Sequence, residues 1–458
     1  MKRLAAFVTY YARQPGVMRR HLGDAARTLA RHGVKSLLAD IRAVSAQIAA
    51  DRRLQRVAAA TPKPQLTRNP ASDPREGTIV IVVHDMTLGG AQQVAQSFAA
   101  WLVRQNRFAV RIVAMRGGPF RAHFQAVAPV FCIADHARRD PQTLSADLAR
   151  WAGPQVRGIL VNSVASGRFF DYWNGAEPAI GFVHEMPKII ERHRAALTLL
   201  AGRADRLVAG SLAVCRALEA HADLPPRVQL YPFVDDDAPA ISQDRAGRQA
   251  ARAALGASAD EVLVCGCGVL HWRKAPERFV DVARRVLAQH DGPIRFVWIG
   301  GGPDLDACRR LIRREGLDKR VRITDYQADA TGLLRAADIF LLPSVEDAFP
   351  LVAMHAALAA APILCFAEAG GMPELVAQGC GTVLPNGDVE AMAQAVCAYA
   401  ADPLRRQREG AVGRKIVAAR MTVSQIGPHL LDALLAQSAS APAMSLSAAP
   451  RHARRIAG

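Results

Sequence analysis

The sequence has no apolar run close to the length of a membrane-spanning helix, and its first residues lack the hydrophobic core of a signal peptide. A helix that crosses a bilayer needs about 20 consecutive, mostly apolar residues. A secretory signal also requires a continuous apolar stretch. We therefore expect a cytoplasmic protein, either free or held peripherally on the inner face of the cell membrane.

Cysteine is sparse, with eight residues scattered over a chain of 458. Most of them lie in apolar runs, which favours reduced, buried thiols in a cytosolic enzyme over a disulfide framework. Cys265 and Cys267 are separated by one glycine, but no second Cys or His pair has the spacing of a matching half of a metal site. We interpret this pair as small residues of a buried strand.

Acidic residues are scarce at the two ends of the chain. Residues 1–75 contain 15 Lys and Arg against 4 Asp and Glu, and residues 433–458 contain three Arg and no acid. The formal net charge of +17 therefore belongs mainly to the ends, and residues 76–432 are close to neutral. Aromatic residues on which bases could stack are sparse along the basic ends, so we expect no nucleic acid as a partner.

Residues 1–75 are predicted to form a basic helical extension and a linker. Apolar residues recur there at helical spacing, and the basic residues fall largely outside this stripe. The apolar positions are Val34, Leu37, Leu38, Ile41, Val44 and Ile48. Such a helix can bind an anionic membrane surface. It can also dock on the neighbouring domain or on a second subunit, and the sequence leaves these alternatives open.

Apolar segments of strand length alternate with helical segments from residue 78 onward, which indicates an α/β protein with parallel strands. The predicted strands are Ile79–Val83, Val110–Met115, Gly158–Val161, Ala179–Val183, Arg206–Ala209, Val262–Cys267, Ile294–Ile299, Val321–Ile323, Ile339–Leu342 and Ile363–Phe366. We expect Rossmann-like domains at residues 76–238 and 239–400, facing one another across a cleft. Residues 401–458 are expected to be a terminal helix and tail, and a helix near residues 389–420 to pack back across the domains.

One predicted strand is followed by a polar loop and an Ala-rich helix. Junctions of this kind are where open α/β sheets bind ligands, and the free amides at a helix N-terminus favour phosphate groups. The loop and the first turns of the helix hold the candidate residues Glu346, Asp347, Phe349, Pro350, Leu351 and His355.

Two adjacent cations, Arg273 and Lys274, follow the glycine-rich end of the first strand of the second half. Arginine offers a bidentate fork and lysine a compact charge, and both suit a diphosphate. Two positive charges at the start of a helix oppose the helix dipole. A purely solvated surface pair is therefore a poorer interpretation than a phosphate site.

Further candidate residues follow other predicted strands. Paired glycines allow the backbone to approach a ligand closely, and a histidine at the carboxyl end of a strand lies at the ligand-binding edge of the sheet. These candidates are Gly89, Gly90, His184, Tyr326, Gly370, Gly371 and Glu374.

Together these motifs resemble the family 4 retaining glycosyltransferases, the group 1 glycosyltransferases of GT-B fold, in family order over about residues 78–400. The family has two Glu separated by seven residues within a Pro-Ser…Phe-Pro-Leu…Glu-Ala frame. The frame is present here, but Asp347 and His355 stand where the two Glu belong. A neutral imidazole has one acceptor nitrogen, so His355 cannot accept hydrogen bonds from both ribose hydroxyls as a carboxylate does.

The resemblance implies a retaining, metal-independent transferase. It would move a sugar from a nucleoside-diphosphate sugar, its co-substrate, to a glycan or lipid-linked acceptor, with no cofactor. It places His184 and Asp347 at the reaction centre, with Glu346 as an alternative acid, and assigns the nucleoside to His355 and Tyr326. It assigns the donor diphosphate to Arg273, Lys274, Gly89, Gly90, Phe349, Pro350 and Leu351. It assigns a loop that closes over the donor to Gly370, Gly371 and Glu374.

Two other functions remain open from the sequence. A nucleotide-sugar 2-epimerase shares the architecture, although the Phe-Pro-Leu frame and the Arg-Lys pair favour transfer. The replacements at Asp347 and His355 also permit a catalytically weakened protein of GT-B type that binds a glycan or a lipid. Polysaccharide biosynthesis is the setting that the resemblance implies.

Overall fold

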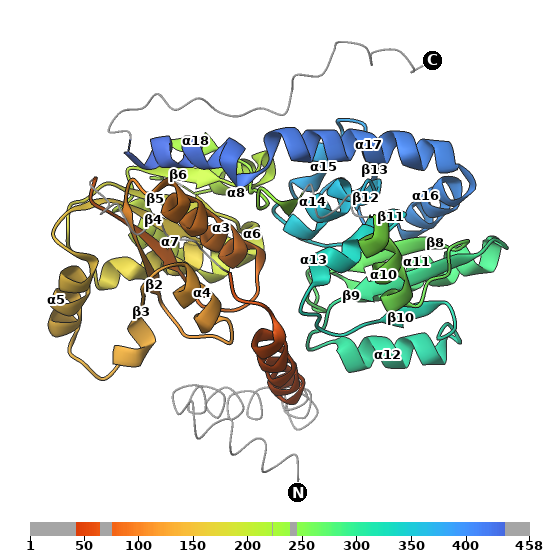
Figure 1. Ribbon diagram of the computed structural model, residues 1–458, viewed down its shortest axis with the longest axis horizontal. Coiled ribbons are helices and arrows are strands. Elements are labelled where there is room, and N and C mark those ends of the chain that lie inside the picture. Colours follow the sequence, from red (N-terminus) through yellow and green to blue (C-terminus); the bar gives the residue numbers. More distant parts are fainter. Residues whose placement is uncertain (1–42, 65–75, 222, 239–244, 436–458) are drawn as a thin grey trace, which may run out of the picture.

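The computed structural model describes residues 43–64, 76–221, 223–238 and 245–435, which form two α/β domains side by side (Figure 1). The first domain contains a parallel sheet of seven strands in the order β3-β2-β1-β4-β5-β6-β7. Its strands are β1 (Thr78–Val83), β2 (Ala109–Ala114), β3 (Val130–Cys132), β4 (Val156–Asn162), β5 (Ala179–Val183), β6 (Arg206–Ala209) and β7 (Arg227–Gln229).

The second domain contains a parallel sheet of six strands in the order β10-β9-β8-β11-β12-β13. Its strands are β8 (Val262–Cys267), β9 (Ile294–Ile299), β10 (Val321–Ile323), β11 (Ile339–Leu342), β12 (Ile363–Phe366) and β13 (Gly381–Leu384). The central strands of both sheets are buried on both faces, which explains why they are continuous apolar runs in the sequence.

Helices connect the strands and cover both sheets. In the first domain they are α3 (Gly90–Gln105), α4 (Arg121–Val127), η1 (Ile133–His136), α5 (Pro141–Ala152), η2 (Val164–Asp171), α6 (Pro187–Arg192), α7 (Arg194–Ala201) and α8 (Leu212–Glu219). In the second they are α10 (Arg245–Leu255), α11 (Pro276–Gln289), α12 (Leu305–Arg314), α13 (Ala330–Leu333), η3 (Leu334–Ala336), α14 (Leu351–Leu358), α15 (Met372–Val376), α16 (Val389–Ala401) and α17 (Pro403–Arg420). A last helix, α18 (Val423–Leu435), follows α17.

Every strand predicted from the sequence is present, within one or two residues at its ends. Three strands were not predicted, namely β3, β7 and β13. Each is three or four residues long and lies at an edge of its sheet. Short edge strands bury few side chains, so they leave little apolar pattern to detect.

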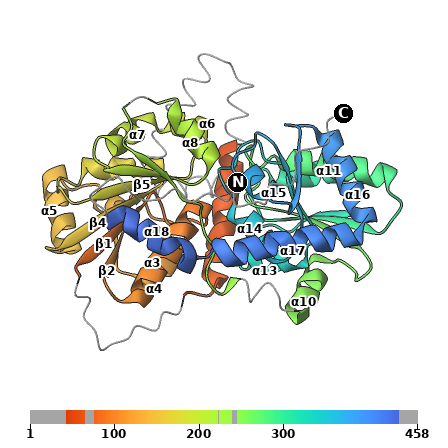
Figure 2. The same ribbon diagram turned by 90° about the horizontal axis from the view of Figure 1, so that it is seen from above.

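The return of the chain to the first domain differs from the prediction. The sequence analysis expected a helix near residues 389–420 to pack across both domains. In the structure α16 and α17 pack on the second domain, against α11 and α14, whereas α18 packs against α3 and β4 of the first domain (Figures 1 and 2). The turn at Met421–Thr422 divides α17 from α18, because Val234 pairs there with the chain on both sides of Thr422.

Part of the predicted extension is described by the structure. Residues 43–60 form a helix, and Ile48 of the predicted apolar stripe is buried. Figure 1 shows this helix below the gap between the two domains, on the side opposite α17 and α18. The rest of the stripe, from Val34 to Ile41, lies outside the described residues.

The structure can be compared with the expectations about membrane-spanning helices, disulfides and metal sites. None of the helices in the described ranges is both long and apolar enough to span a membrane. All eight cysteines are free. Cys265 and Cys267 are buried on β8, where burial raises the pKa of both thiols, and no metal-binding group of three His, Cys, Asp or Glu side chains is found among the described residues.

Candidate active site

A cavity of about 500 Å³ lies between the carboxyl ends of the two sheets. In each sheet the strand order reverses beside the first strand, between β1 and β4 and between β8 and β11, and ligands of open α/β sheets bind at such points. Residues of both domains line the cavity. The predicted site residues among them are Gly89, Gly90, His184, Arg273, Lys274, Tyr326, Asp347, Phe349, Pro350 and Leu351.

The cationic pair lies on the second-domain wall of the cavity. Gly268 ends β8 with φ +138°, and a Cβ there would lie 3.1 Å from Cε of Lys274, so this glycine lets the lysine lie against the strand end. The Lys274 ammonium forms an ion pair with the Asp347 carboxylate. Arg273 lines the cavity and has no ion-pair partner among the described residues. The wall therefore presents one free cation and one cation held by an acid that an anionic ligand could displace.

Two helix N-termini meet at the cavity. Gly89 precedes α3 and Pro350 precedes α14, and neither helix has a side-chain cap. A Cβ on Gly90 would lie 3.9 Å from Cγ of Leu351, so the two helix starts approach closely across the cleft. Uncapped amides and the helix dipoles favour an anion at this place.

His184 follows β5 on the first-domain wall. The Asn162 side-chain amide donates to the Ala91 carbonyl (2.9 Å), so its oxygen accepts from Nε2 of His184 (2.9 Å). Burial lowers the pKa of His184 to about 4. The ring is therefore neutral at pH 7, with its proton on Nε2, and Nδ1 remains as an acceptor for a ligand hydroxyl.

The buried carboxylate of Glu185 holds the backbone around His184 by hydrogen bonds. Glu185 accepts hydrogen bonds from the His184 backbone N–H (2.9 Å), the Val164 N–H (3.2 Å) and the Ser163 hydroxyl. Ser163 has φ +85°, a conformation that costs a non-glycine residue on the order of 1 kcal/mol or more. The network with Glu185 offsets that cost and fixes the turn that carries His184.

Tyr326, from the loop after β10, lines the cavity. His355 lies one turn into α14, close to the charges of Asp329 and Asp237, and it does not line the cavity. Burial lowers the pKa of His355 to about 4, so its ring is neutral at pH 7.

Residues 261–402 match the family described as glycosyl transferases group 1. The chain resembles this family over those residues. It is similar to D-inositol 3-phosphate glycosyltransferase of Mycobacterium tuberculosis (strain ATCC 25618 / H37Rv) and of Mycobacterium bovis (strain ATCC BAA-935 / AF2122/97), with 31% identity over 301 residues in each case. The match covers 63% of this chain and 57% of the relatives, so the chain spans little more than half the length of these curated relatives.

Solved structures show the fold of this chain. HepE of Anabaena, in complex with UDP and glucose, superposes with a TM-score of 0.65 at 20% identity over 77% of this chain and 98% of that chain. WaaG, a glycosyltransferase involved in lipopolysaccharide biosynthesis, gives a TM-score of 0.60 at 16% identity over 78% and 99% of the two chains. The fold is therefore GT-B, with two Rossmann-like domains, as the sequence predicted.

Glu346 does not line the cavity. It is buried, with 9% of its surface exposed, and one carboxylate oxygen lies 3.7 Å from Nζ of Lys188 on the first domain. The other oxygen has no hydrogen-bond partner among the described residues. Of these two neighbouring acids, Asp347 lines the cavity and Glu346 does not.

The predicted donor-closing loop lies outside the cavity and ties the two domains together. Glu374 accepts hydrogen bonds from the backbone N–H groups of Leu212 and Ala213 at the start of α8 (3.1 Å each) and from the Tyr231 hydroxyl (2.9 Å). We call this set of contacts the Glu374 tie. In this structure the Glu374 carboxylate caps a helix of the first domain, and its expected role in a loop that closes over the donor stays a prediction.

The two glycines of the same loop hold the Asp347 segment. A Cβ on Gly370 would come within 1.8 Å of the Asp347 carbonyl oxygen, and one on Gly371 would meet Ser211 of the first domain at 2.5 Å. The Asp347 N–H donates to the Ala369 carbonyl at 2.6 Å. These glycines therefore position Asp347 from outside the cavity instead of covering a ligand.

Several first-domain residues of the cavity were not predicted from the sequence. Gln92 donates to Asp85 (2.6 Å) and contacts Nε2 of His84 (3.0 Å), and Arg116 lies 3.6 Å from Asp85. Burial alone would raise the pKa of Asp85, but the His84 charge and hydrogen bonds from Thr87 and Gln92 lower it. His84, Asp85 and Gln92 lie within eight residues of one another, and of these four residues only Arg116 comes from further along the chain.

His271 on the second-domain wall was also missed. The Arg273 backbone N–H donates to its Nδ1 (3.2 Å), so Nε2 carries the proton of the neutral ring. Burial, and then the charges of Arg273 and Lys274, lower the pKa of His271 to about 4. The site thus gains a neutral donor beside the cationic pair.

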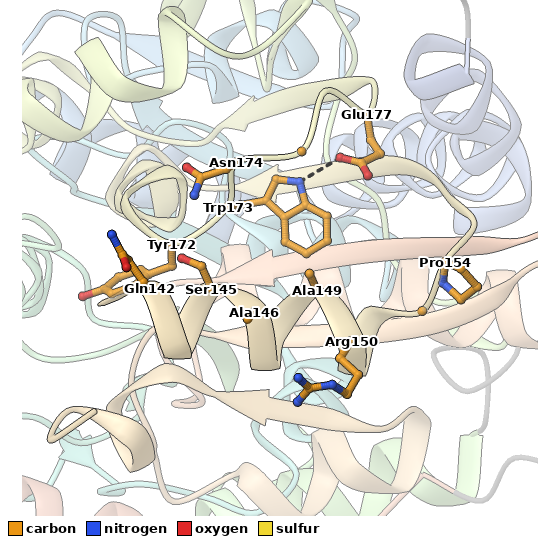
Figure 3. Close-up of a pocket in the computed structure, with 12 residues that line it drawn as sticks. Gln142, Ser145, Ala146, Ala149, Arg150, Pro154, Tyr172, Trp173, Asn174 and Glu177 are labelled. Carbon is orange, nitrogen blue, oxygen red and sulfur yellow. Dashed lines mark hydrogen bonds between the residues drawn. The ribbon is translucent and has the colours of Figure 1, made fainter. Parts of the chain in front are cut away.

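A larger cavity, about 690 Å³, lies on the first domain away from this site (Figure 3). Its lining comes from α5 and from the segments that precede β4 and β5, at the amino ends of these strands. Trp173 lies at its centre and donates to Glu177 (3.0 Å). Because the candidate active site lies at the carboxyl ends of the strands, this cavity is not part of it.

Proposed function

We propose that this protein transfers a sugar from a nucleoside-diphosphate sugar to a hydroxyl of an acceptor. The observation that carries the proposal is the convergence of a cationic pair, two uncapped helix N-termini and a neutral histidine on one interdomain cavity. Arg273 and Lys274 would neutralise the diphosphate as its charge grows during departure, which stabilises the transition state. The donor would lie on the second domain and the acceptor on the first.

The reaction is proposed to retain the anomeric configuration and to need no divalent ion. The acceptor hydroxyl would attack on the face from which the diphosphate leaves, and a phosphate oxygen would take its proton. His184 would accept a sugar hydroxyl on Nδ1, and Asp347 would bind another once the ligand phosphate replaces it as the partner of Lys274. The family resemblance and the position of these groups support this scheme.

Turnover with a panel of UDP- and GDP-sugars, with the product anomer identified by NMR, tests the proposal. The wild type should release the nucleoside diphosphate and retain the anomer. His184→Ala should lower kcat by about 100-fold, because it removes a polar group that contacts the reacting sugar. The variant should still bind the nucleoside diphosphate, since His184 lies on the opposite wall. An inverted product would overturn the retaining mechanism.

UDP is the first donor nucleotide to test, because HepE, whose fold this chain shares, was solved with UDP and with UDP-glucose. A nucleoside diphosphate that binds the native state raises the melting temperature, and at one ligand concentration a tighter ligand raises it further. A thermal-shift screen of UDP, GDP and ADP therefore ranks the donor nucleotides before any sugar is known.

A non-catalytic protein of GT-B type is the second candidate, favoured by His355. A neutral imidazole at this position is a poorer partner for two ribose hydroxyls than a carboxylate. Nucleotide binding without any turnover over the sugar panel would support this candidate and exclude transfer.

We propose that the acceptor is a glycan or a lipid-linked glycan, with the basic residues 1–75 bound to an anionic membrane surface. Each Lys or Arg near such a surface contributes on the order of 1 kcal/mol. The full-length protein should co-sediment with anionic vesicles at 50 mM salt and dissociate at 500 mM, since salt screens these charges. Equal binding to neutral vesicles would exclude this mode.

A further inference from the structure

The helix of residues 43–60 contacts both domains at the opening of the cleft. Towards the first domain, the Thr61 carbonyl after the helix accepts a hydrogen bond from Nε2 of His123 (3.0 Å). Leu54 and Ala58 pack against an apolar cluster that includes residues of both domains. Towards the second domain the helix is held by Arg53. Figures 1 and 2 both show the helix between the domains. It is therefore a bridge beside the cavity.

Arg53 forms two ion pairs with the second domain. Its guanidinium lies 3.5 Å from the Asp325 carboxylate and 3.7 Å from the Asp306 carboxylate. The side chains of Arg53 and Asp325 are both 27% exposed, so solvent screens this pair only in part. Asp325 is the partner that links Arg53 to the active site.

Asp325 fixes the loop that carries Tyr326. Its backbone has φ +80°, a region that non-glycine residues rarely adopt. Its carboxylate accepts the backbone N–H of Tyr326 (2.8 Å), and a Cβ on Gly301 would come within 2.3 Å of the same oxygen. Tyr326 lines the cavity, at the end where the proposed function places the nucleoside. The position of the Asp325 carboxylate therefore decides where the Tyr326 backbone lies.

A second residue of the helix acts on Tyr326 directly. Burial, and then the negative charge of Asp51, raise the pKa of Tyr326 to about 12. Asp51 therefore lies close enough to Tyr326 for its charge to raise the pKa of the phenol. The helix is thus near Tyr326 as well as near Asp325.

We propose that the helix of residues 43–60 is a working part of the donor site, and that Arg53 is a positioning residue that holds the Tyr326 loop for the nucleoside. This proposal rests on the proposed function, because it takes the cavity to bind a nucleoside diphosphate. It assigns to the extension a role in nucleotide affinity that is separate from any membrane contact. Arg53 acts through Asp325 and does not touch the ligand.

Isothermal titration of the full-length protein with UDP, GDP and ADP tests this proposal, with inorganic pyrophosphate as a probe of the phosphate half alone. Arg53→Glu places a third carboxylate beside Asp325 and Asp306. It should weaken the tightest nucleoside diphosphate about tenfold and leave pyrophosphate within twofold. Arg53→Lys should keep most of the affinity, because it preserves the charge.

The matched control is Arg56→Glu, the same charge change at an exposed position of the same helix. It should bind nucleotide like the wild type. In an Asp325→Gly background, which suits φ +80° and lacks the carboxylate, Arg53→Glu should cost threefold or less. Such a cycle isolates the coupling between the two residues.

Three results separate the outcomes. Nucleotide binding by Arg53→Glu within twofold of the wild type would overturn this inference and leave the proposed function intact. An equal loss of nucleotide and pyrophosphate would also overturn it, since the variant would then have damaged the whole site. A wild-type protein that binds none of the three nucleotides would refute the proposed function itself.

Discussion

Three histidines, of which His184 and His271 line the cavity, are neutral because they are buried, and this links stability to pH. Burial lowers the pKa of His184, His271 and His355 to about 4, whereas an unfolded histidine titrates near 6.5. As pH falls the unfolded chain therefore binds protons first. The stability that these groups contribute is present above about pH 6.5 and is lost as the pH falls from 6.5 to 4.

His355→Gln tests this linkage at one position. The variant removes a group whose depressed pKa costs stability in acid, on the order of 3 kcal/mol between pH 6.5 and 4. Urea unfolding at several pH values should therefore show a shallower loss of stability in the variant than in the wild type. His429→Gln, at an exposed position, is the control. Identical pH slopes in all three proteins would contradict the assignment.

The site could be predicted residue by residue only where a local motif marked it. Arg273, Lys274 and Asp347 stand in short, recognisable segments, and the structure brings all three to one cavity. His271 and Asp85 lie beside marked segments, two residues before Arg273 and four before Gly89, but the burial that shifts the pKa of each comes only from the fold. Sequence position alone also could not show that Lys274 pairs with Asp347.

At the scale of elements, loops of the second domain reach into the first. The Glu374 tie satisfies two amides at the start of α8, and the ring of its partner Tyr231 lies 5.1 Å from the ring of Phe349, which lines the cavity. The sequence placed this loop correctly after a strand but assigned it to the ligand. The direction in which a loop points depends on the domain opposite, which no local pattern encodes.

Glu374→Ala tests the tie. The substitution leaves two helix amides and the Tyr231 hydroxyl without their acceptor, which should lower the free energy of unfolding by about 2 kcal/mol. Glu368→Ala, at an exposed position of the same loop, should change it by less than about 0.5 kcal/mol. Equal stability of the two variants in urea would show that the domains do not depend on this contact.

At the scale of the whole molecule, the chain passes between the two domains twice, and the two connecting segments lie side by side. Val234 accepts from the Val423 N–H (2.9 Å) and donates to the Met421 carbonyl (3.0 Å), so the outward and return connections are hydrogen-bonded together. One apolar cluster also includes residues of both domains and of α18. The repeated alternation of strand and helix predicted two halves, but the course of α18 follows from packing against the first domain.

The central claim is that the interdomain cavity holds the diphosphate of an activated sugar against Arg273 and Lys274. Its most direct test is calorimetric titration of the tightest nucleoside diphosphate into the wild type, Arg273→Ala and Arg313→Ala, the last at an exposed position of α12 outside the cavity. A hydrogen bond to a charged group contributes about 1.5–3 kcal/mol, so Arg273→Ala should bind at least tenfold more weakly. Arg313→Ala should bind like the wild type. Unchanged affinity in Arg273→Ala would contradict the account.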